Sequence, residues 1–330
     1  MTIQSPNEQI GLWPITSSVD WCEKNFEHSY YIAEFWNSLS SVAMIMFGEV
    51  GARVNSCESF RFRLAFRLVS VVGIGSLLFH GTLTSQMQAL DEVPMVWSAL
   101  TILHSLIESN YGKKGLWLPI LLILHAILCT ASITISTGAL QVTFFLTSFC
   151  SIELVSMLLM YRIYSSKKVS HPSIKLLFER GVMIYVLAST TWLIDLYLCD
   201  YVNGEEKSIL PFNPQLHAVW HILASSGLYL LVVLTLYNWL YENGKKCKVE
   251  WWFGGLVPVC TVLDAENTRS FHREKKANVR STSGPYYQRA EVQHEESPVN
   301  RSIPSKRLRS ESKYPKERAG GERELKWENN

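Results

Sequence analysis

Seven long apolar stretches in the first 240 residues constrain this chain more than any other feature of its sequence. A helix needs about 20 mostly apolar residues to cross the hydrocarbon core of a bilayer. Each stretch reaches that length, which predicts an all-α membrane protein built as a seven-transmembrane helix bundle. The expected spans are approximately 33–52, 62–82, 89–109, 115–134, 138–162, 178–198 and 214–240.

The lysines and arginines of the short loops predict the orientation of this bundle. They follow the first, third, fifth and seventh spans, whereas the opposite side carries only Lys24 and Lys207. Because basic loops remain in the cytosol, we expect residues 1–32 to form a lumenal N-terminal segment and the C-terminus to be cytosolic. Residues 33–240 form the membrane domain, and residues 241–263 are expected to be an interfacial segment.

The last part of the chain has a different composition. From position 264 onward, 26 of 67 residues are charged, 15 of them basic and 11 acidic. Such a segment buries too little apolar surface to fold alone, so residues 264–330 are expected to be a disordered cytosolic tail. The apolar body and the net charge of +2 exclude a single soluble domain, a nucleic-acid binder and a disulfide-dense secreted scaffold.

The seven cysteines divide by side of the membrane. Cys22 and Cys199 are the two that the topology places on the outer face, where a lumenal compartment permits disulfides. Two free thiols remain the alternative. We predict a bridge that ties the N-terminal segment to the loop between the last two spans.

Polar side chains gather at one end of three predicted spans. Ser76 and His80 are four residues apart near the outer end of the second span, and His217 and His221 have the same spacing at the outer end of the seventh. Asp91 opens the third span on the same side. Residues four apart share a helix face, and ionisable groups inside spans mark function by default.

Three imidazoles with an open fourth position are the ligand set of a catalytic zinc site. A pair of histidines four residues apart is weak evidence alone, because such a pair can simply form hydrogen bonds with neighbouring helices. The common depth of His80, His217 and His221, together with Ser76 and Asp91, makes the metal interpretation stronger.

The N-terminal segment carries a second candidate site. Asp20, Glu23 and Asn25 are hard oxygen donors within six residues, and Glu34 and the carbonyl of Trp21 can add to them. Calcium accepts six to eight oxygens in irregular geometry, so a short loop with a distant carboxylate suits it. The spacing is not that of an EF-hand, and composition alone also fits an acidic surface loop.

These motifs together resemble those of the alkaline ceramidases. The resemblance rests on Trp13-Pro14 followed by Asp20-Trp21-Cys22-Glu23 and Asn25, on SLLFHGTL, and on HAVWH at the start of the last span. It covers roughly residues 11–240. The wider superfamily with this Ser-His-Asp-His-His pattern includes the adiponectin receptors, but the N-terminal signature favours the ceramidase branch.

The resemblance implies a seven-span amidase of the endoplasmic reticulum or Golgi membrane that hydrolyses ceramide, and it implies no protein partner. It implies zinc ligands His80, His217 and His221, with Ser76 and Asp91 as catalytic partners. It also implies a structural or regulatory calcium ion and supports the Cys22–Cys199 bridge. The implied calcium ligands are Asp20, Trp21 through its carbonyl, Glu23, Asn25 and Glu34.

Two rival functions remain open at the level of sequence. An adiponectin-receptor-like protein would share the zinc pattern and bind an external protein. A transporter would use its histidines and aspartate as a proton path, but it needs ionisable groups spread through the membrane, whereas here they concentrate at one end.

Overall fold

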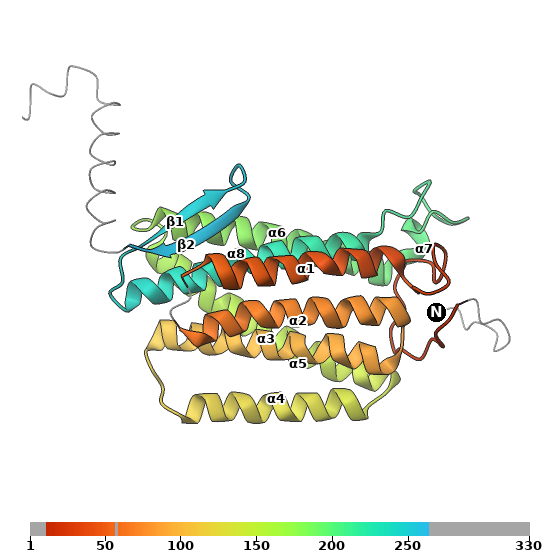
Figure 1. The fold of residues 1–330 in the computed structure, drawn as a ribbon, viewed down its shortest axis with the longest axis horizontal. Helices are drawn as coiled ribbons and strands as arrows, with labels where there is room; N and C mark the ends of the chain where they lie inside the picture. Colours follow the sequence, from red (N-terminus) through yellow and green to blue (C-terminus); the bar gives the residue numbers. More distant parts are fainter. Residues whose placement is uncertain (1–10, 57–58, 264–330) are drawn as a thin grey trace, which may run out of the picture. The chain divides into compact units, whose positions relative to one another are not determined.

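The computed structural model describes residues 11–56 and 59–263, so the predicted tail and the first ten residues lie outside the account that follows. Within this part the chain forms mostly helices and one two-stranded sheet (Figure 1). The helices are α1 (Phe35–Val54), α2 (Phe60–Thr82), α3 (Ser85–Tyr111), α4 (Trp117–Ile135), α5 (Gly138–Lys167), α6 (Pro172–Tyr197), α7 (Cys199–Val202) and α8 (Leu216–Glu242).

Each of the seven expected spans corresponds to one long helix, with α7 as a short additional turn. Five of these helices, α2, α4, α5, α6 and α8, are long and apolar enough to cross a membrane by length and composition. Helices α1 and α3 fall outside that group. Their buried faces carry polar residues, among them Asn37, Ser41, Gln88 and Glu92.

Helix α8 supplies the centre of the core. Its second half is almost completely buried, and residues Leu231 to Leu234 are each at most 2% exposed. It packs most extensively against α6 and also against α1, while α1 packs against α2 and α2 against α3. Helix α4 lies at the edge of the bundle beside α3 and α5 and exposes a stripe of large apolar residues, as expected for a lipid-facing helix (Figure 1).

The residues expected to form an interfacial segment fold into an antiparallel hairpin, which the all-helical prediction omits. Strand β1 (Cys247–Trp252) pairs with β2 (Val257–Val262), with Val249 opposite Cys260. β-branched and aromatic residues favour strands, and Gly254 and Gly255 supply the positive φ angles of the turn.

Asn55 fixes this hairpin to the end of the bundle. Its side chain accepts a hydrogen bond from the backbone N–H of Cys260 at 2.8 Å and donates to the hydroxyl of Tyr229 at 3.3 Å. Tyr229 in turn donates to the carbonyl of Pro258 at 2.9 Å. The hairpin therefore packs against α8 at the end of the bundle where α1 finishes.

The N-terminal segment covers the opposite end. The backbone N–H groups of Thr16 and Ser17 both donate to the carbonyl of Leu83 at 3.0 Å, in the turn between α2 and α3. The N–H groups of Ala33 and Glu34 donate to carbonyls in the last turn of α2. The chain before α1 is thus held against the end of the bundle where α2 finishes and α3 and α8 begin.

Gly48 allows α1 and α2 to approach closely. A Cβ at this position would lie 2.3 Å from the hydroxyl of Ser70 and 2.6 Å from the carbonyl oxygen of Phe66. We expect Gly48→Ala to destabilise the bundle by about 1–3 kcal/mol through overpacking. Thermal unfolding in detergent measures the effect, and Gly81→Ala is the matched control, since its Cβ would meet nothing closer than 3.7 Å. Equal midpoints for the two variants would contradict this packing.

Candidate metal centre

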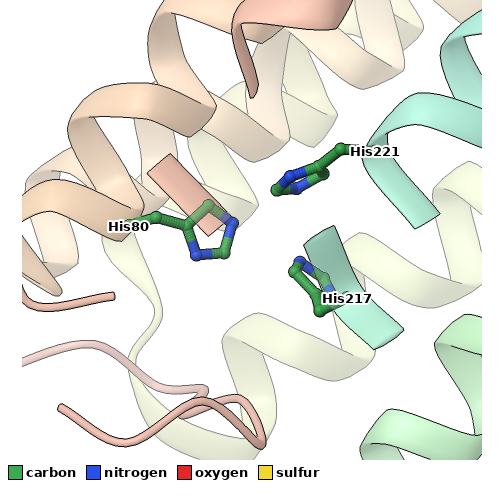
Figure 2. Close-up of side chains that lie close together, drawn as sticks. All are labelled: His80, His217 and His221. Carbon is green, nitrogen blue, oxygen red and sulfur yellow. The ribbon is translucent and has the colours of Figure 1, made fainter. Parts of the chain in front are cut away.

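Three histidines from two helices meet at the end of the bundle covered by the N-terminal segment. His80 lies in the last turn of α2, and His217 and His221 lie on one face of the first two turns of α8. One ligand atom from each ring lies within 4.8 Å of the others (Figure 2). All three are fully buried, at most 2% exposed. The predicted convergence of these residues is present in the fold.

Each ring is oriented by a contact that leaves another nitrogen for a ligand. The Nδ1 atom of His80 contacts the carboxylate of Glu34, and the Nδ1 atom of His221 is 2.8 Å from the hydroxyl of Ser40. The ring of His217 stacks on Trp21 at 3.7 Å between centroids. Ligating histidines in metal sites are typically oriented in this way.

The remaining nitrogens fit a zinc ion. The Nε2 of His80 and the Nδ1 of His217 are buried and have no hydrogen-bond partner in the described residues. A buried polar atom without a partner is costly, and a metal would satisfy both. Ligand nitrogens about 2.0–2.1 Å from a tetrahedral zinc lie about 3.4 Å apart, so small inward shifts of the rings suffice. Within the described residues this is the only such group of histidine, cysteine and acidic side chains.

Ser76 lies beside the histidines. Its hydroxyl is 3.4 Å from Nε2 of His221 and accepts a hydrogen bond from Ser41 at 3.0 Å. Ser41 also donates to the carbonyl of Asn37 at 2.8 Å, so its single hydroxyl hydrogen is shared between these two acceptors. Ser76 is 1% exposed.

Asp91 lies next to this group but is not part of it. Gly75 allows the backbones of α2 and α3 to touch here, since a Cβ on Gly75 would lie 2.2 Å from the carbonyl oxygen of Leu90 and 3.0 Å from Cα of Asp91. The side chain of Asp91 lines a narrow cavity that also reaches Trp220. The ring of Trp220 stacks on His217 at 5.0 Å, so one aromatic side chain joins this cavity to the metal centre.

The acidic N-terminal residues have distinct positions. Glu23 caps α1, because its two carboxylate oxygens accept the backbone N–H groups of Trp36 at 2.7 Å and Asn37 at 2.9 Å. Burial, with repulsion from Glu34 as a smaller cause, raises the pKa of Glu23 to about 7. Asp20 accepts a hydrogen bond from the amide of Asn25 at 3.0 Å.

Glu34 joins the two candidate sites, a role that the sequence did not indicate. One carboxylate oxygen accepts the backbone N–H of Trp21 at 3.2 Å, and the other contacts His80 and accepts the amide of Asn37 at 3.1 Å. Glu34 is fully buried. Its residue type and its place at the start of α1 were visible in the sequence, but its contact with a histidine 46 positions away was not.

Several observations on the loop residues fit a hard cation such as calcium, and one does not. The amide oxygen of Asn25 is buried and has no partner in the described residues, so a cation there would satisfy it. Each carboxylate oxygen accepts more than one bond, so Glu23 and Glu34 can keep their backbone contacts and also bind calcium. The carboxylates of Asp20, Glu23 and Glu34 do not form a group as close as the histidines within the described part.

Two further features hold the N-terminal segment to α6, α7 and α8. Cys22 and Cys199 form the predicted disulfide. Asp195, which is 2% exposed, accepts the backbone N–H of Cys22 at 3.1 Å and that of His217 at 3.2 Å. This carboxylate therefore supplies the missing cap of α8, whose own first residue before the helix, Gln215, makes no side-chain cap.

A polar network that the sequence did not reveal anchors the segment on its other side. Glu92 accepts the amides of Gln88 at 2.7 Å and Gln141 at 3.2 Å. The amide oxygens of these two glutamines accept the backbone N–H and the hydroxyl of Ser18, respectively. A satisfied buried network specifies one arrangement, and here it fixes the residue next to Asp91.

Comparisons with known proteins agree with this geometry. Residues 13–261 match the family model described as Ceramidase. Alkaline ceramidase 3 of Mus musculus is 32% identical over 257 residues, which cover 75% of this chain and 93% of that protein. Alkaline ceramidase of Arabidopsis thaliana is 29% identical, covering 74% and 92%. Alkaline ceramidase YPC1 of Saccharomyces cerevisiae is 30% identical, covering 68% and 77%.

Replacement of His217 by alanine is expected to remove bound zinc, because two imidazoles bind the ion too weakly to retain it during purification. Elemental analysis of the purified protein should give about one zinc per wild-type chain and close to none for His217→Ala. His125→Ala is the matched control, since His125 lies on α4 and contacts Cys129. Full zinc content in His217→Ala would remove this residue from the ligand set.

Proposed function

We propose, since this chain belongs to the ceramidase family, that it hydrolyses the N-acyl amide bond of ceramide to a sphingoid base and a free fatty acid. The observation that carries the proposal is the group of three buried histidines, placed beside Ser76 and the cavity that Asp91 lines, with one unpartnered ring nitrogen on each of His80 and His217. The three relatives described above, each of which matches at least two thirds of this chain, are named alkaline ceramidases.

The proposed ion is zinc, held by His80, His217 and His221. When bound, zinc supplies a Lewis acid and lowers the pKa of its water to about 7. Ser76 would donate its hydroxyl hydrogen to the carbonyl oxygen of the amide, where negative charge develops during attack. Asp91 takes a proton from the attacking water and returns it to the leaving amine.

The membrane explains why this chemistry is placed inside a helix bundle. We propose that all seven long helices cross the membrane, that the N-terminal segment is lumenal and that the C-terminus is cytosolic, in the endoplasmic reticulum or Golgi. The lysines and arginines of the loops support this orientation. A lipid with two hydrocarbon chains then reaches the histidines from the bilayer, while its polar end stays near the lumenal headgroups.

We also propose that calcium binds in the N-terminal segment at Asp20, the carbonyl of Trp21, Glu23, Asn25 and Glu34. Calcium bound there takes no part in the chemistry. It would fix the residues that press Trp21 against His217 and Glu34 against His80. The calcium ion would thereby reduce the motion of the side chains of His80 and His217, two of the proposed zinc ligands.

Asp91→Asn is expected to lower kcat for ceramide hydrolysis by about 10²–10⁴, the usual contribution of a general acid–base group. The matched control is Asp200→Asn on the exposed surface of α7. Release of fatty acid from ceramide by purified protein measures both. Wild-type protein that binds zinc yet releases no fatty acid from any ceramide would contradict the proposed function.

Asn25→Ala is expected to raise the calcium concentration needed for half-maximal activity about tenfold, because it removes one oxygen ligand. Glu34→Gln is expected to raise the same concentration and also to lower zinc content, since this residue contacts His80. A calcium titration of activity, with zinc measured in parallel, separates the two effects. An unchanged titration curve for Asn25→Ala would exclude this residue from the site.

A further inference from the structure

A second cavity lies in the half of the bundle away from the histidines, and α2 and α4 form its two walls. It has a volume of about 830 Å³, within the range of sites that hold one small ligand. Helix α3 forms the floor, because it packs against both α2 and α4. Along α4 the lining runs from Pro119 to Ala131, which corresponds to about 18 Å of helix. We call this cavity the lateral groove.

The length and lining of the lateral groove match the hydrocarbon part of one membrane leaflet. One leaflet contributes about 15 Å, half of the roughly 30 Å hydrocarbon core of a bilayer. Leu64 and Leu68 on α2 line one wall, and Leu122, Ile123 and Ile127 on α4 line the other. Ile123 and Ile127 are each 58% exposed. The groove is therefore open and suited to the hydrocarbon chains of a lipid.

The end of the lateral groove nearest the loop between α3 and α4 is polar. Arg61 lines it and contacts the carboxylate of Glu108, which also accepts the backbone N–H of Lys114. A guanidinium carries several N–H donors, so the bond to Glu108 leaves others for a ligand.

A second polar side chain of the groove lacks a hydrogen-bond partner. His104 lines the groove one helical turn before Glu108, and its Nε2 atom is buried without a hydrogen bond to any described residue. The carboxylate of Glu108 is 3.7 Å from this nitrogen, beyond hydrogen-bond distance. An unpaired imidazole nitrogen at the floor of an apolar groove indicates a ligand that carries a polar atom at this depth.

Four further cations adjoin this end of the groove, namely Arg63, Arg67, Lys113 and Lys114. The two arginines are exposed and share one face of α2 beside the groove wall, since they are four residues apart. The two lysines belong to the loop that Glu108 holds next to Arg61. Among the described residues, none of the four forms an ion pair with an acidic side chain. Because Arg61 already matches Glu108, this end carries an excess of positive charge.

We propose that the lateral groove binds an anionic phospholipid of the cytosolic leaflet. The topology proposed above places this end of the bundle at the cytosolic surface, where anionic lipids concentrate. The phosphate accepts hydrogen bonds from Arg61 and the neighbouring cations, and an ester carbonyl just below it accepts from Nε2 of His104. The hydrocarbon chains fill the space between α2 and α4. This lipid takes no part in hydrolysis, so the inference does not depend on the proposed function.

The charge at the groove decides between an anionic lipid and a neutral one. A zwitterionic lipid offers the same chains and ester carbonyls, but its net charge of zero does not match the excess of cations. Each lysine or arginine near a membrane surface strengthens the binding of anionic lipid about fivefold. The long side chain of Arg67 reaches the headgroups while its stem covers apolar surface.

The test follows the unfolding temperature of the full-length protein in a neutral detergent as lipid is added. A ligand that binds the folded state raises the unfolding midpoint. Phosphatidylserine should raise it at a concentration about tenfold lower than phosphatidylcholine with the same chains. Inorganic phosphate, which brings the charge without the chains, should not raise it.

Two variants test the charge and the groove separately. Arg63→Gln/Arg67→Gln should raise the phosphatidylserine concentration for half of the shift about tenfold or more. Lys168→Gln/Lys175→Gln is its matched control, since it removes two exposed cations near the turn between α5 and α6. Ile127→Trp should fill the groove and abolish the shift. Leu128→Trp is the control, because Leu128 is 67% exposed on α4 and lies outside the lining.

Each shift is measured against the same variant without lipid, so a less stable variant cannot imitate the effect. Equal action of phosphatidylserine and phosphatidylcholine on the wild type would overturn the preference for an anionic lipid. A shift lost in the arginine variant but kept in Ile127→Trp would mean an anion at the surface only, and would overturn the groove. A shift unchanged in both variants would overturn the whole proposal.

Discussion

The contact between the carboxylate of Glu34 and His80 is the interaction on which the rest of the site depends. It lies where three parts of the chain meet, because Glu34 ends the N-terminal segment, precedes α1 and touches the end of α2. A buried carboxylate must be fully satisfied, and Glu34 is bonded to the backbone of Trp21, the amide of Asn37 and the ring of His80. Loss of the contact with Glu34 would leave the ring of His80 without the group that orients it.

This requirement explains the composition of the helices around the site. Helices α1 and α3 carry side chains that satisfy the buried groups, such as Ser40 beside His221 and Glu92 beside the glutamines. The lipid-facing helix α4 has no such task and exposes apolar side chains. The N-terminal segment completes the site through Trp21 and is held by the disulfide, by Asp195 and by the network around Ser18.

Much of the fold and the grouping of the three histidines could be predicted from the sequence, since both depend on regular patterns. Apolar runs of fixed length give the helices, and a spacing of four places His217 and His221 on one face. The disulfide followed from topology. The hairpin was missed because its tryptophans also suit a membrane interface. The hydrogen bonds of Asn55 and Tyr229 to the second strand join residues that are distant in sequence, so the sequence did not reveal them.

The sequence did not predict the structural roles of three acidic residues, Glu23, Glu34 and Asp195. Each role depends on contacts between residues distant in sequence or on the local path of the chain. The acidic loop offered Glu23 as an oxygen donor, and the structure adds its role as the cap of α1. Asp195 was noted only as a polar residue near the outer end of its span, and its two backbone partners come from Cys22 and His217. Glu153 was expected to pair with another helix, and that partner is Tyr185.

The central claim is that three imidazoles bind one zinc ion between α2 and α8. X-ray absorption at the zinc edge of the purified protein tests it most directly. The account predicts three nitrogen neighbours with imidazole scattering and one oxygen, at about 2.0–2.1 Å. Sulfur neighbours at about 2.3 Å, or fewer than three imidazoles in a protein with full zinc content, would contradict it.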